Sequence, residues 1–533
     1  MRLFRIASRA NSFGRKKITG VATRLSLDAL LVAGGGGAGS NHAGGGGGAG
    51  GLLYNSFELI TDNSLIVTVG GGGTGGGGPN GSGLNGTNTS ITSTVTSSYV
   101  AVGGGAGGGE VAPALATSGG SGGGGSGTST AAGVNKVGQP GTAGQGSAGG
   151  NGSSTQYDGY GAAGGGGGAV GTGANASGNA GGAGGAGSGA YSTILTAASA
   201  GVDSGGTRYI AGGGGGGGWT NGPGGGGAAA SGGLGGGGNS AASGSGSSGS
   251  PNTGGGGGGS GGDTAPRNGG TGGGGIVIIR YPGSQAAMGG TINTTGGFTY
   301  HKYTATSYFY ATEEVKDSLA LFYDASINAS YSGSGTTMYD LSGNSKNGAM
   351  DNCGYSSSNG GYITFNGSSS RIRVGAVTSG QNITYSLWFY RQGSSAAVLF
   401  WDDDSQGAGD SWVAVTASNL IEIQSDNSGF YFLSSVGAIT SNRWNNLTFV
   451  ASSSSPNKSI YINGALDTSN NVAIRSRSGI SYVTLGHGYD GGGNIVNQWF
   501  QGYMSKFSIY SRALTAAEVA QNYNANKSRF GLS

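Results

Sequence analysis

The 533-residue sequence has a single cysteine (Cys353), eight prolines, three histidines and few charged residues, which make up 9% of the chain. One cysteine excludes a disulfide framework and any cysteine-based zinc site. Eight prolines exclude a collagen triple helix, which needs roughly 15–20% proline and a strict Gly-X-Y repeat. No run approaches the roughly 18 apolar residues of a membrane-spanning helix, so membrane insertion is not predicted.

The few charges are unevenly distributed. Residues 1–30 hold seven basic residues and one acidic residue, whereas the rest of the chain holds 18 basic and 21 acidic residues. Because the body of the chain has no basic face, nucleic-acid binding is not predicted. Arg24 and Asp28 interrupt the only apolar run of the leader, which argues against a secretory signal. Residues 1–29 are either a solvated basic tail or an anchor that docks on an acidic partner.

Glycine is what the sequence has in excess. Of its 129 glycines, 98 lie in residues 31–280. Such a segment is either a flexible coil or a packed bundle of polyglycine helices of the polyproline II type. A linker has no need of apolar β-branched runs, yet such runs occur at 30–32, 65–69 and 276–281. These runs are typical of strands that cap an ordered glycine-rich domain over residues 30–282.

The rest of the chain has the pattern of a β protein. Residues 283–316 predict a short β-linker, with His301 on a strand surface. Residues 317–533 contain five of the six tryptophans and a dozen short strands separated by turns such as Asn366-Gly367, which indicates a jelly-roll β-sandwich. The capping box at 515–518 predicts one helix near the end. The predicted fold class is therefore mainly β, a polyglycine helix bundle with capping strands followed by a sandwich.

The glycine-rich half resembles a known family. Leu31-Val32-Ala33 followed by Gly34–Gly37, the recurring glycine blocks, and the closing run from Gly274 to Tyr281 are similar to the glycine-rich domain of bacteriophage tail-fibre and adhesin proteins. In that family, packed polyglycine helices present loops to host receptors. The resemblance implies a virion protein whose residues 1–30 dock on other virion proteins. It also implies a homo-oligomer, of which a trimer is one form, although the sequence has no heptad repeat to set the number.

The last third resembles a second family. Asp340-Leu-Ser-Gly-Asn, Phe365-Asn-Gly, the strand 385–389 and the segment 511–519 are similar to the concanavalin A-like lectin/glucanase superfamily in its laminin-G-like form. This superfamily contains lectins, glucanases, adhesion modules and spacers, so the resemblance specifies a fold more than a function. Its glucanases carry their carboxylates as Glu-x-Asp-x-x-Glu on one strand, and no such triplet occurs here. The chain is therefore predicted not to be an enzyme.

Sugar binding needs aromatic faces and hydroxyl-binding polar groups. The loops of the predicted sandwich offer these groups at Trp401, Asp402, Trp412, Tyr489, Asp490 and Asn494. Either tryptophan could equally be a core residue. The turn Asp402-Asp403-Asp404 could bind Ca²⁺, since hard cations prefer clustered oxygens, or it could be a solvated loop. No other cofactor is predicted.

The preferred interpretation is a virion structural protein, a phage tail fibre or receptor-binding adhesin that contacts host-surface glycans. Two alternatives stay open. A head fibre or capsid decoration protein would use the same modules attached to the shell. A polysaccharide depolymerase would need two carboxylates about 5–10 Å apart.

Overall fold

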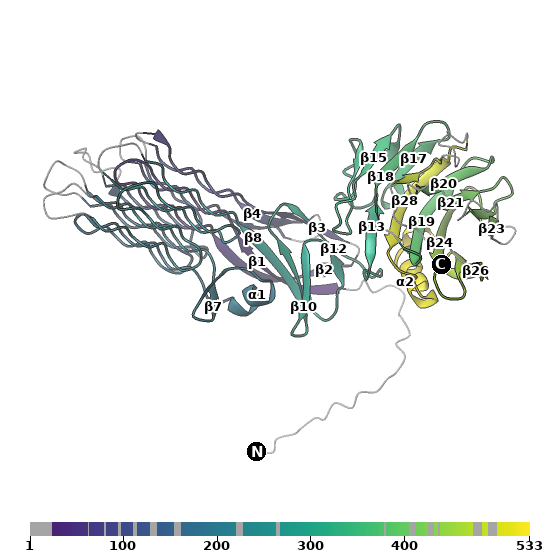
Figure 1. Cartoon of the computed structure of the whole chain (residues 1–533), viewed down its shortest axis with the longest axis horizontal. Coiled ribbons are helices and arrows are strands. Elements are labelled where there is room, and N and C mark those ends of the chain that lie inside the picture. Colours follow the sequence, from purple (N-terminus) through teal and green to yellow (C-terminus); the bar gives the residue numbers. More distant parts are fainter. Residues whose placement is uncertain are drawn as a thin grey trace, which may run out of the picture.

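The computed structural model describes the chain from residue 24 to residue 532. It leaves out residues 62, 79–80, 94–96, 110–114, 128–135, 154–160, 220–226, 263–266, 378–379, 404–410, 425–430, 435–437, 473–481 and 489–497. The described residues form two β domains, with the glycine runs at one end of the molecule and a sandwich at the other (Figure 1). Within these residues no helix has the length and apolar character needed to cross a bilayer.

Two five-stranded antiparallel sheets lie between the glycine runs and the sandwich (Figure 1). The first sheet has the order β10 (Thr291–Thr295), β11 (Phe298–Tyr303), β8 (Ile276–Pro282), β1 (Arg24–Val32) and β2 (Leu52–Ile60). The second has the order β5 (Tyr99–Ala101), β4 (Thr89–Thr92), β3 (Ser64–Thr68), β12 (Ser307–Ala311) and β9 (Ala287–Met288). Leu31, Val67 and Val277 are fully buried in the core between them. The three apolar runs predicted as strands are thus confirmed.

The segment 283–316 is not a separate linker. It supplies β9, β10, β11 and β12, so each sheet of the glycine-rich domain is completed by strands that follow the last glycine run. The prediction of a surface position for His301 is also wrong, because its side chain is 0% exposed. The reason is the pairing of β11 with β8, which makes β11 an inner strand and turns His301 toward the second sheet. At the other boundary, β1 begins at Arg24, inside the predicted anchor.

The glycine runs are joined by backbone hydrogen bonds, and successive residues of one run bond to different neighbouring runs in turn. Successive N–H groups of residues 34–41 donate in turn to carbonyls of 81–87, 267–273 and 45–48, at 2.8–3.2 Å. Every third residue therefore returns to the same neighbouring run. Three is also the number of residues per turn of a polyproline II helix. The order that the sequence predicts for this segment is realised through the backbone, with no helix or strand assigned to the runs.

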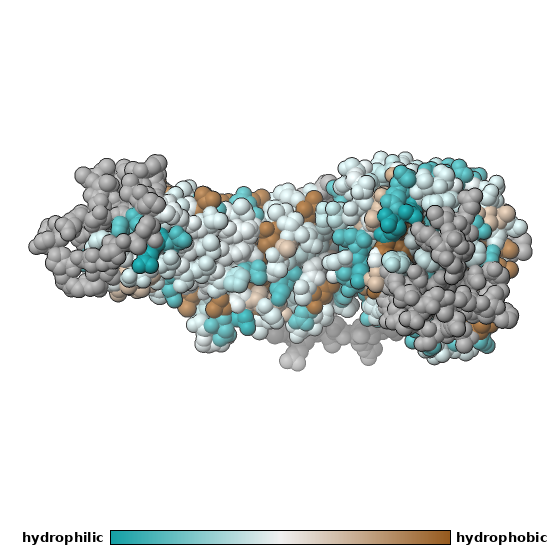
Figure 2. Space-filling view, turned by 45° about the horizontal axis from the view of Figure 1, so that its top comes forward, coloured by the Kyte–Doolittle hydropathy of each residue, from teal (hydrophilic) through white to brown (hydrophobic). Residues whose placement is uncertain are grey.

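At many glycines of these runs the backbone packing leaves no room for a side chain. A methyl group added at Gly256 would lie 1.9 Å from the carbonyl oxygen of Gly47, and one added at Gly214 would lie 1.8 Å from that of Gly257. Real Cβ atoms do not approach that closely. Larger apolar side chains such as Leu195 and Ile210 are buried in a small cluster with residues of β1 and β8. On the face shown in Figure 2, exposed apolar side chains are scattered singly along the molecule. The glycine runs thus form a rod whose interior consists mainly of main chain.

The second domain consists of two larger antiparallel sheets. One has the order β16 (Gly354–Ser356), β17 (Tyr362–Asn366), β28 (Gln501–Tyr510), β19 (Ile383–Arg391), β24 (Trp444–Ala451), β25 (Lys458–Ile462) and β26 (Ala465–Asn470), with β13 (Leu319–Asp324) also paired to β28. The other has the order β14 (Thr337–Met338), β15 (Gly348–Asp351), β18 (Arg371–Gly375), β27 (Tyr482–Leu485), β20 (Ala397–Asp403), β21 (Ser411–Val415), β22 (Ile421–Gln424) and β23 (Tyr431–Leu433).

The core of this sandwich follows from period-two alternation. In β19, Tyr385, Leu387 and Phe389 point into the shared core, as the sequence pattern predicts. The opposite face of β19 carries Trp388, which packs under the C-terminal helix region. The predicted helix is confirmed as α2 (Ala516–Asn526), and its capping box is complete. Further short elements, α1 (Ser192–Ala197) and the hairpin β6 (Val202–Ser204) with β7 (Thr207–Tyr209), had no clear sequence signal.

Candidate functional site

The described residues of the predicted sugar-binding rim lie on β20 and β21, which are adjacent in one sheet. Trp401 lies directly opposite Trp412 in the pairing of β20 with β21. Trp401 is only 7% exposed. Trp412 is partly exposed, but its indole Nε1 atom is buried and has no hydrogen-bond partner among the described residues. The two tryptophans are thus cross-strand neighbours, and Trp401 lies in the interior.

The acidic turn is only partly described. The side chain of Asp402 is 1% exposed and accepts a hydrogen bond from the hydroxyl of Tyr385, which comes from the opposite sheet. Asp404, Tyr489, Asp490 and Asn494 lie outside the described residues, as does the side chain of Asp403. In the part of the chain that is described, no three acidic, histidine or cysteine side chains form a metal-binding group. The calcium site and the rim site stay predictions.

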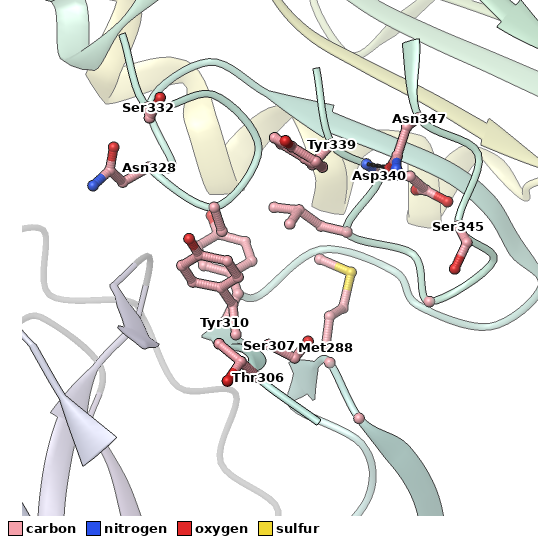
Figure 3. Close-up of a pocket in the computed structure, with 16 residues that line it drawn as sticks. Met288, Thr306, Ser307, Tyr310, Asn328, Ser332, Tyr339, Asp340, Ser345 and Asn347 are labelled. Carbon is pink, nitrogen blue, oxygen red and sulfur yellow. Dashed lines mark hydrogen bonds between the residues drawn. The ribbon is translucent and has the colours of Figure 1, made fainter. Parts of the chain in front are cut away.

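A cavity of about 410 Å³ lies where the two domains meet (Figure 3). One wall comes from the glycine-rich domain, through Met288, the turn after it, and residues 306–310. The other wall comes from two loops of the sandwich, residues 328–332 and 339–347. Figure 3 shows Tyr310, Ser307 and Met288 on the first side, and Tyr339, Asp340 and Ser345 on the second.

The cavity has an apolar floor and a polar rim. Met288 and Tyr310 pack with Phe322, Ile327 and Ala329 in a small buried cluster between the domains. Above this floor the exposed lining residues carry hydroxyl and amide groups: Asn328, Ser332, Tyr339, Ser345 and Asn347. This combination of an apolar base with a few polar groups is typical of small-molecule sites.

Asp340 is the only acidic or basic residue among those that line the cavity. Its carboxylate accepts hydrogen bonds from the backbone N–H groups of Phe322, Ser342 and Lys346 and from the hydroxyl of Ser342, at 2.8–3.0 Å. All of these bonds shape the loop that forms the sandwich wall. The carboxylate is therefore committed to the loop, and the cavity presents mainly neutral groups to a ligand.

A buried ionic cluster fixes the connecting segment to the sandwich. Lys506 on β28 donates to Glu314 and lies 3.2 Å from Asp324, and Arg529 binds the same Asp324 through two bonds of 2.8 and 3.0 Å. Burial alone would raise the pKa of Asp324, but the charges of Arg529 and Lys506 outweigh it and lower the pKa to about 2. Asn526 completes the cluster through a 2.6 Å bond to Glu314. Both domains are thus held at a fixed junction beside the cavity.

His301 fixes the turn on the other wall. Its Nδ1 atom lies 2.7 Å from the carbonyl oxygen of Gly289, which can only accept, so Nδ1 carries the proton and Nε2 accepts from the hydroxyl of Tyr281 at 2.9 Å. The Tyr281 oxygen in turn accepts from the N–H groups of Ala286 and Ala287. Burial lowers the pKa of His301 to about 4 and raises that of Tyr281 to about 12. The network is neutral and fully hydrogen-bonded at ordinary pH.

The cavity residues were not among the predicted site residues. The sequence marks residues 340–344 only as a motif of the sandwich family and places residues 308–310 only within the predicted linker 283–316. An aromatic run inside a polar connector was the available signal, since a plain linker has no use for it. The pairing of these two segments depends on how the domains dock, and no local pattern encodes that.

Comparisons with known proteins agree with this two-domain description. A family model described as a glycine-rich domain matches residues 14–282, just over half of the chain, and the chain belongs to this family. A model of the concanavalin A-like lectin/glucanases superfamily matches residues 357–520, which identifies the C-terminal domain. No curated protein matches the chain.

Several solved structures resemble the sandwich at low similarity. Domain 4 of AbnA, an extracellular arabinanase from Geobacillus stearothermophilus in complex with arabinotriose, is 19% identical with a TM-score of 0.31, over 38% of this chain and 98% of that one. A SAP-like pentraxin from Limulus polyphemus is 18% identical with a TM-score of 0.27, over 30% and 79%. The Ruminococcus gnavus sialidase module CBM40, bound to α2,3-sialyllactose, is 14% identical with a TM-score of 0.24, over 27% and 82%. At these TM-scores no property is transferred to this chain.

Proposed function

We propose that this chain is a receptor-binding adhesin of a bacteriophage, a non-enzymatic virion protein of the tail fibre that contacts glycans on the host surface. The observation that carries this proposal is the fixed attachment of the second domain to the glycine-rich domain. A domain that matches a lectin/glucanase family is fixed to the glycine-rich domain through the buried Glu314–Lys506 pair and an apolar contact. An adhesin needs this combination, because a stiff rod holds its binding domain away from the particle.

The rod is proposed to be a bundle of polyglycine helices of the polyproline II type. The rotation of the donors of residues 34–41 among three neighbouring runs supports this assignment. A high-resolution crystal structure would test it directly. Backbone angles near φ −75° and ψ +145° in the runs are expected, and extended β values would contradict the proposal.

Residues 1–30 are proposed to dock on other virion proteins. They hold seven basic residues and one acidic residue, whereas the rest of the chain has a small excess of acidic residues. A homo-oligomer, with a trimer as one form, and a Ca²⁺ ion at residues 402–404 belong to the same proposal. The mass of the assembled protein in solution tests the oligomeric state, and calcium titration tests the metal site.

The absence of catalysis is supported by how the carboxylates are used. Asp324 is paired with Arg529, Asp340 holds a loop, and Asp351 lies between Arg371 and Arg373. Glycoside hydrolysis needs one carboxyl that holds a proton and a second that is free to act on the sugar or on water. Acidic side chains already bound to arginine or to backbone N–H groups are poor candidates for either role.

One carboxyl favours the depolymerase alternative. Burial raises the pKa of Glu422, as a general acid requires, and its side chain is only partly exposed. Incubation of the full chain and its Glu422→Gln variant with host polysaccharide distinguishes the two functions. Shortening of the polysaccharide by the natural chain but not by the variant would establish a depolymerase and contradict the proposal.

The primary test is binding of the full chain to a glycan array and to a panel of bacterial strains, each with and without EDTA. We expect saturable binding to cells of at least one strain and to the matching glycans. EDTA sensitivity would support the calcium site at 402–404. Saturable binding to cells that is not diminished when periodate oxidises the sugars of the cell surface would contradict glycan recognition. Binding to neither cells nor array would contradict the adhesin.

A further inference from the structure

We infer that the cavity between the two domains binds a neutral sugar residue, with the ring of Tyr339 as its stacking surface. This inference rests on the proposed glycan-binding function, and it names a site and a ligand class that the sandwich family does not specify. The cavity differs from the predicted rim at β20 and β21, whose tryptophan Trp401 is buried.

The first argument is the combination of aromatic and polar groups. Tyr339 is 51% exposed, and Tyr308 on the opposite wall is partly exposed. A pyranose ring presents C–H groups on its faces and hydroxyls at its edge, so it matches an aromatic surface surrounded by hydrogen-bonding groups. Figure 3 shows Tyr339 on one wall and the hydroxyl groups of Ser307 and Thr306 on the other.

The second argument is that these polar groups are available. In the described structure, the amide of Asn328 and the hydroxyls of Ser345 and Tyr339 make no hydrogen bond within the chain. Asn347 uses its carbonyl oxygen to accept from the N–H group of Asp340, which leaves its NH₂ group for a ligand. Sugar hydroxyls both donate and accept, and such mixed amide and hydroxyl groups satisfy both roles.

The third argument is charge. Asp340 is the one charged lining residue, and its carboxylate oxygens are occupied by backbone and Ser342 donors. Among the described residues that line the cavity, none is a lysine or arginine that could pair with a carboxylate, sulfate or phosphate group on a sugar. A neutral sugar therefore fits this lining better than sialic acid or a uronic acid does.

The fourth argument is size and rigidity. A volume of about 410 Å³ falls within the range of about 300–1,000 Å³ found for small-ligand sites. The walls come from different domains, but the Glu314–Lys506 pair and the contact of Tyr310 with Phe322 hold them together. A preformed site of this kind spends little binding free energy on closing.

The test uses the full chain and saturation-transfer NMR with glucose, galactose, mannose, N-acetylglucosamine and N-acetylneuraminic acid as probes. We expect transfer to at least one neutral sugar and none to N-acetylneuraminic acid. Tyr339→Ala should weaken the affinity at least tenfold, and Tyr339→Phe, which keeps the ring, should weaken it less. Tyr482→Ala is the matched control, because this tyrosine is 55% exposed and lies on β27, away from the cavity.

The outcomes separate the inference from the proposed function. If the chain binds cells or a glycan and Tyr339→Ala binds equally well, the cavity is not the site, although the adhesin proposal stands. Loss of binding in Tyr482→Ala alone would move the site to the rim. Transfer to N-acetylneuraminic acid but to no neutral sugar overturns the ligand class, and transfer to no probe overturns the inference for these sugars. A thermal unfolding midpoint equal to that of the natural chain confirms that each variant is folded.

Discussion

The two halves of this molecule build their interiors from different material. In the sandwich, alternate side chains such as Tyr385, Leu387 and Phe389 fill the space between sheets. In the glycine rod, the main chain itself fills the space, and runs lie so close that an added Cβ at Gly256 would meet a carbonyl at 1.9 Å. Ordering glycine costs roughly 0.5–1 kcal/mol more per residue than ordering alanine. Dense backbone hydrogen bonding therefore has to do in the rod what apolar burial does in the sandwich.

The sharpest test of this contrast adds one methyl group to a tightly packed glycine of the rod and, separately, to a glycine with open space around it. Gly256→Ala would push against the Gly47 carbonyl and disturb the bond that this oxygen accepts from Gly214. We expect a loss on the order of 5 kcal/mol, the sum of overpacking and unsatisfied backbone groups. Gly71→Ala is the control, because its nearest neighbour is Thr87 Oγ1 at 3.9 Å. Urea unfolding, with hydrogen exchange of the rod amides as the readout, measures the stability of both variants. Equal stability of the two would contradict a backbone-packed interior.

The next largest effect is expected at the junction. Lys506→Met leaves Glu314 and Asp324 buried without their shared cation. Breaking one side of a buried ion pair costs about 3–5 kcal/mol. Tryptophan fluorescence during urea unfolding reports this loss, since five of the six tryptophans lie in the sandwich. The double variant Lys506→Met, Glu314→Gln should recover part of the stability, and a double variant as unstable as the single one would show that the charge is not the cause.

Acid should weaken the glycine-rich domain before it weakens the sandwich. The folded pKa of His301 is about 4, below its ordinary 6.5, so the unfolded chain binds more protons between these values. Its contribution is complete above pH 6.5 and is lost as the pH falls toward 4, by about 3 kcal/mol in total. The corresponding window for Asp324 lies between its ordinary 3.8 and about 2. Hydrogen exchange of both domains at pH 7, 5.5 and 4.5 tests the order, and His301→Gln should remove the pH dependence of the first domain in this range.

The smallest effect is expected at the C-terminal helix. Thr515→Ala removes the hydroxyl that accepts from the N–H group of Glu518. Loss of such a cap costs about 1 kcal/mol. Thr515→Ser keeps the hydroxyl and should behave like the natural chain in thermal unfolding. A comparable loss in both variants would indicate that packing of the Thr515 methyl group, not capping, stabilises the helix start.

Sequence patterns predicted the elements that rest on local signals. The alternation in β19, the apolar runs of β1, β3 and β8, and the capping box of α2 are all local, and all are confirmed. What local patterns could not predict is which distant segments meet. β1 pairs with β8 across about 250 residues, and the strands of 283–316 complete both sheets. Because these pairings are not local, residues 283–316 have the sequence pattern of a linker.

The same limit applies to the candidate site. The predicted sugar-binding rim stays a prediction, although two of its residues, Trp401 and Trp412, lie opposite each other on β20 and β21. The junction cavity needs the loop that Asp340 organises to meet the turn that His301 holds, and these come from separate domains. His301 itself has the sequence context of an exposed strand residue, and only its neighbours across the sheet bury it.

The backbone packing of the glycine runs has a consequence for how their stability depends on temperature. Unfolding a domain raises the heat capacity through exposed apolar surface and lowers it through exposed polar surface. The glycine runs bury peptide groups and few apolar side chains larger than alanine, so their unfolding should carry an unusually small heat-capacity change per residue. The free energy of unfolding of these runs should then vary almost linearly with temperature, without the downturn at low temperature that a large heat-capacity change produces. Cooling, which weakens an apolar core, should not destabilise this part of the molecule.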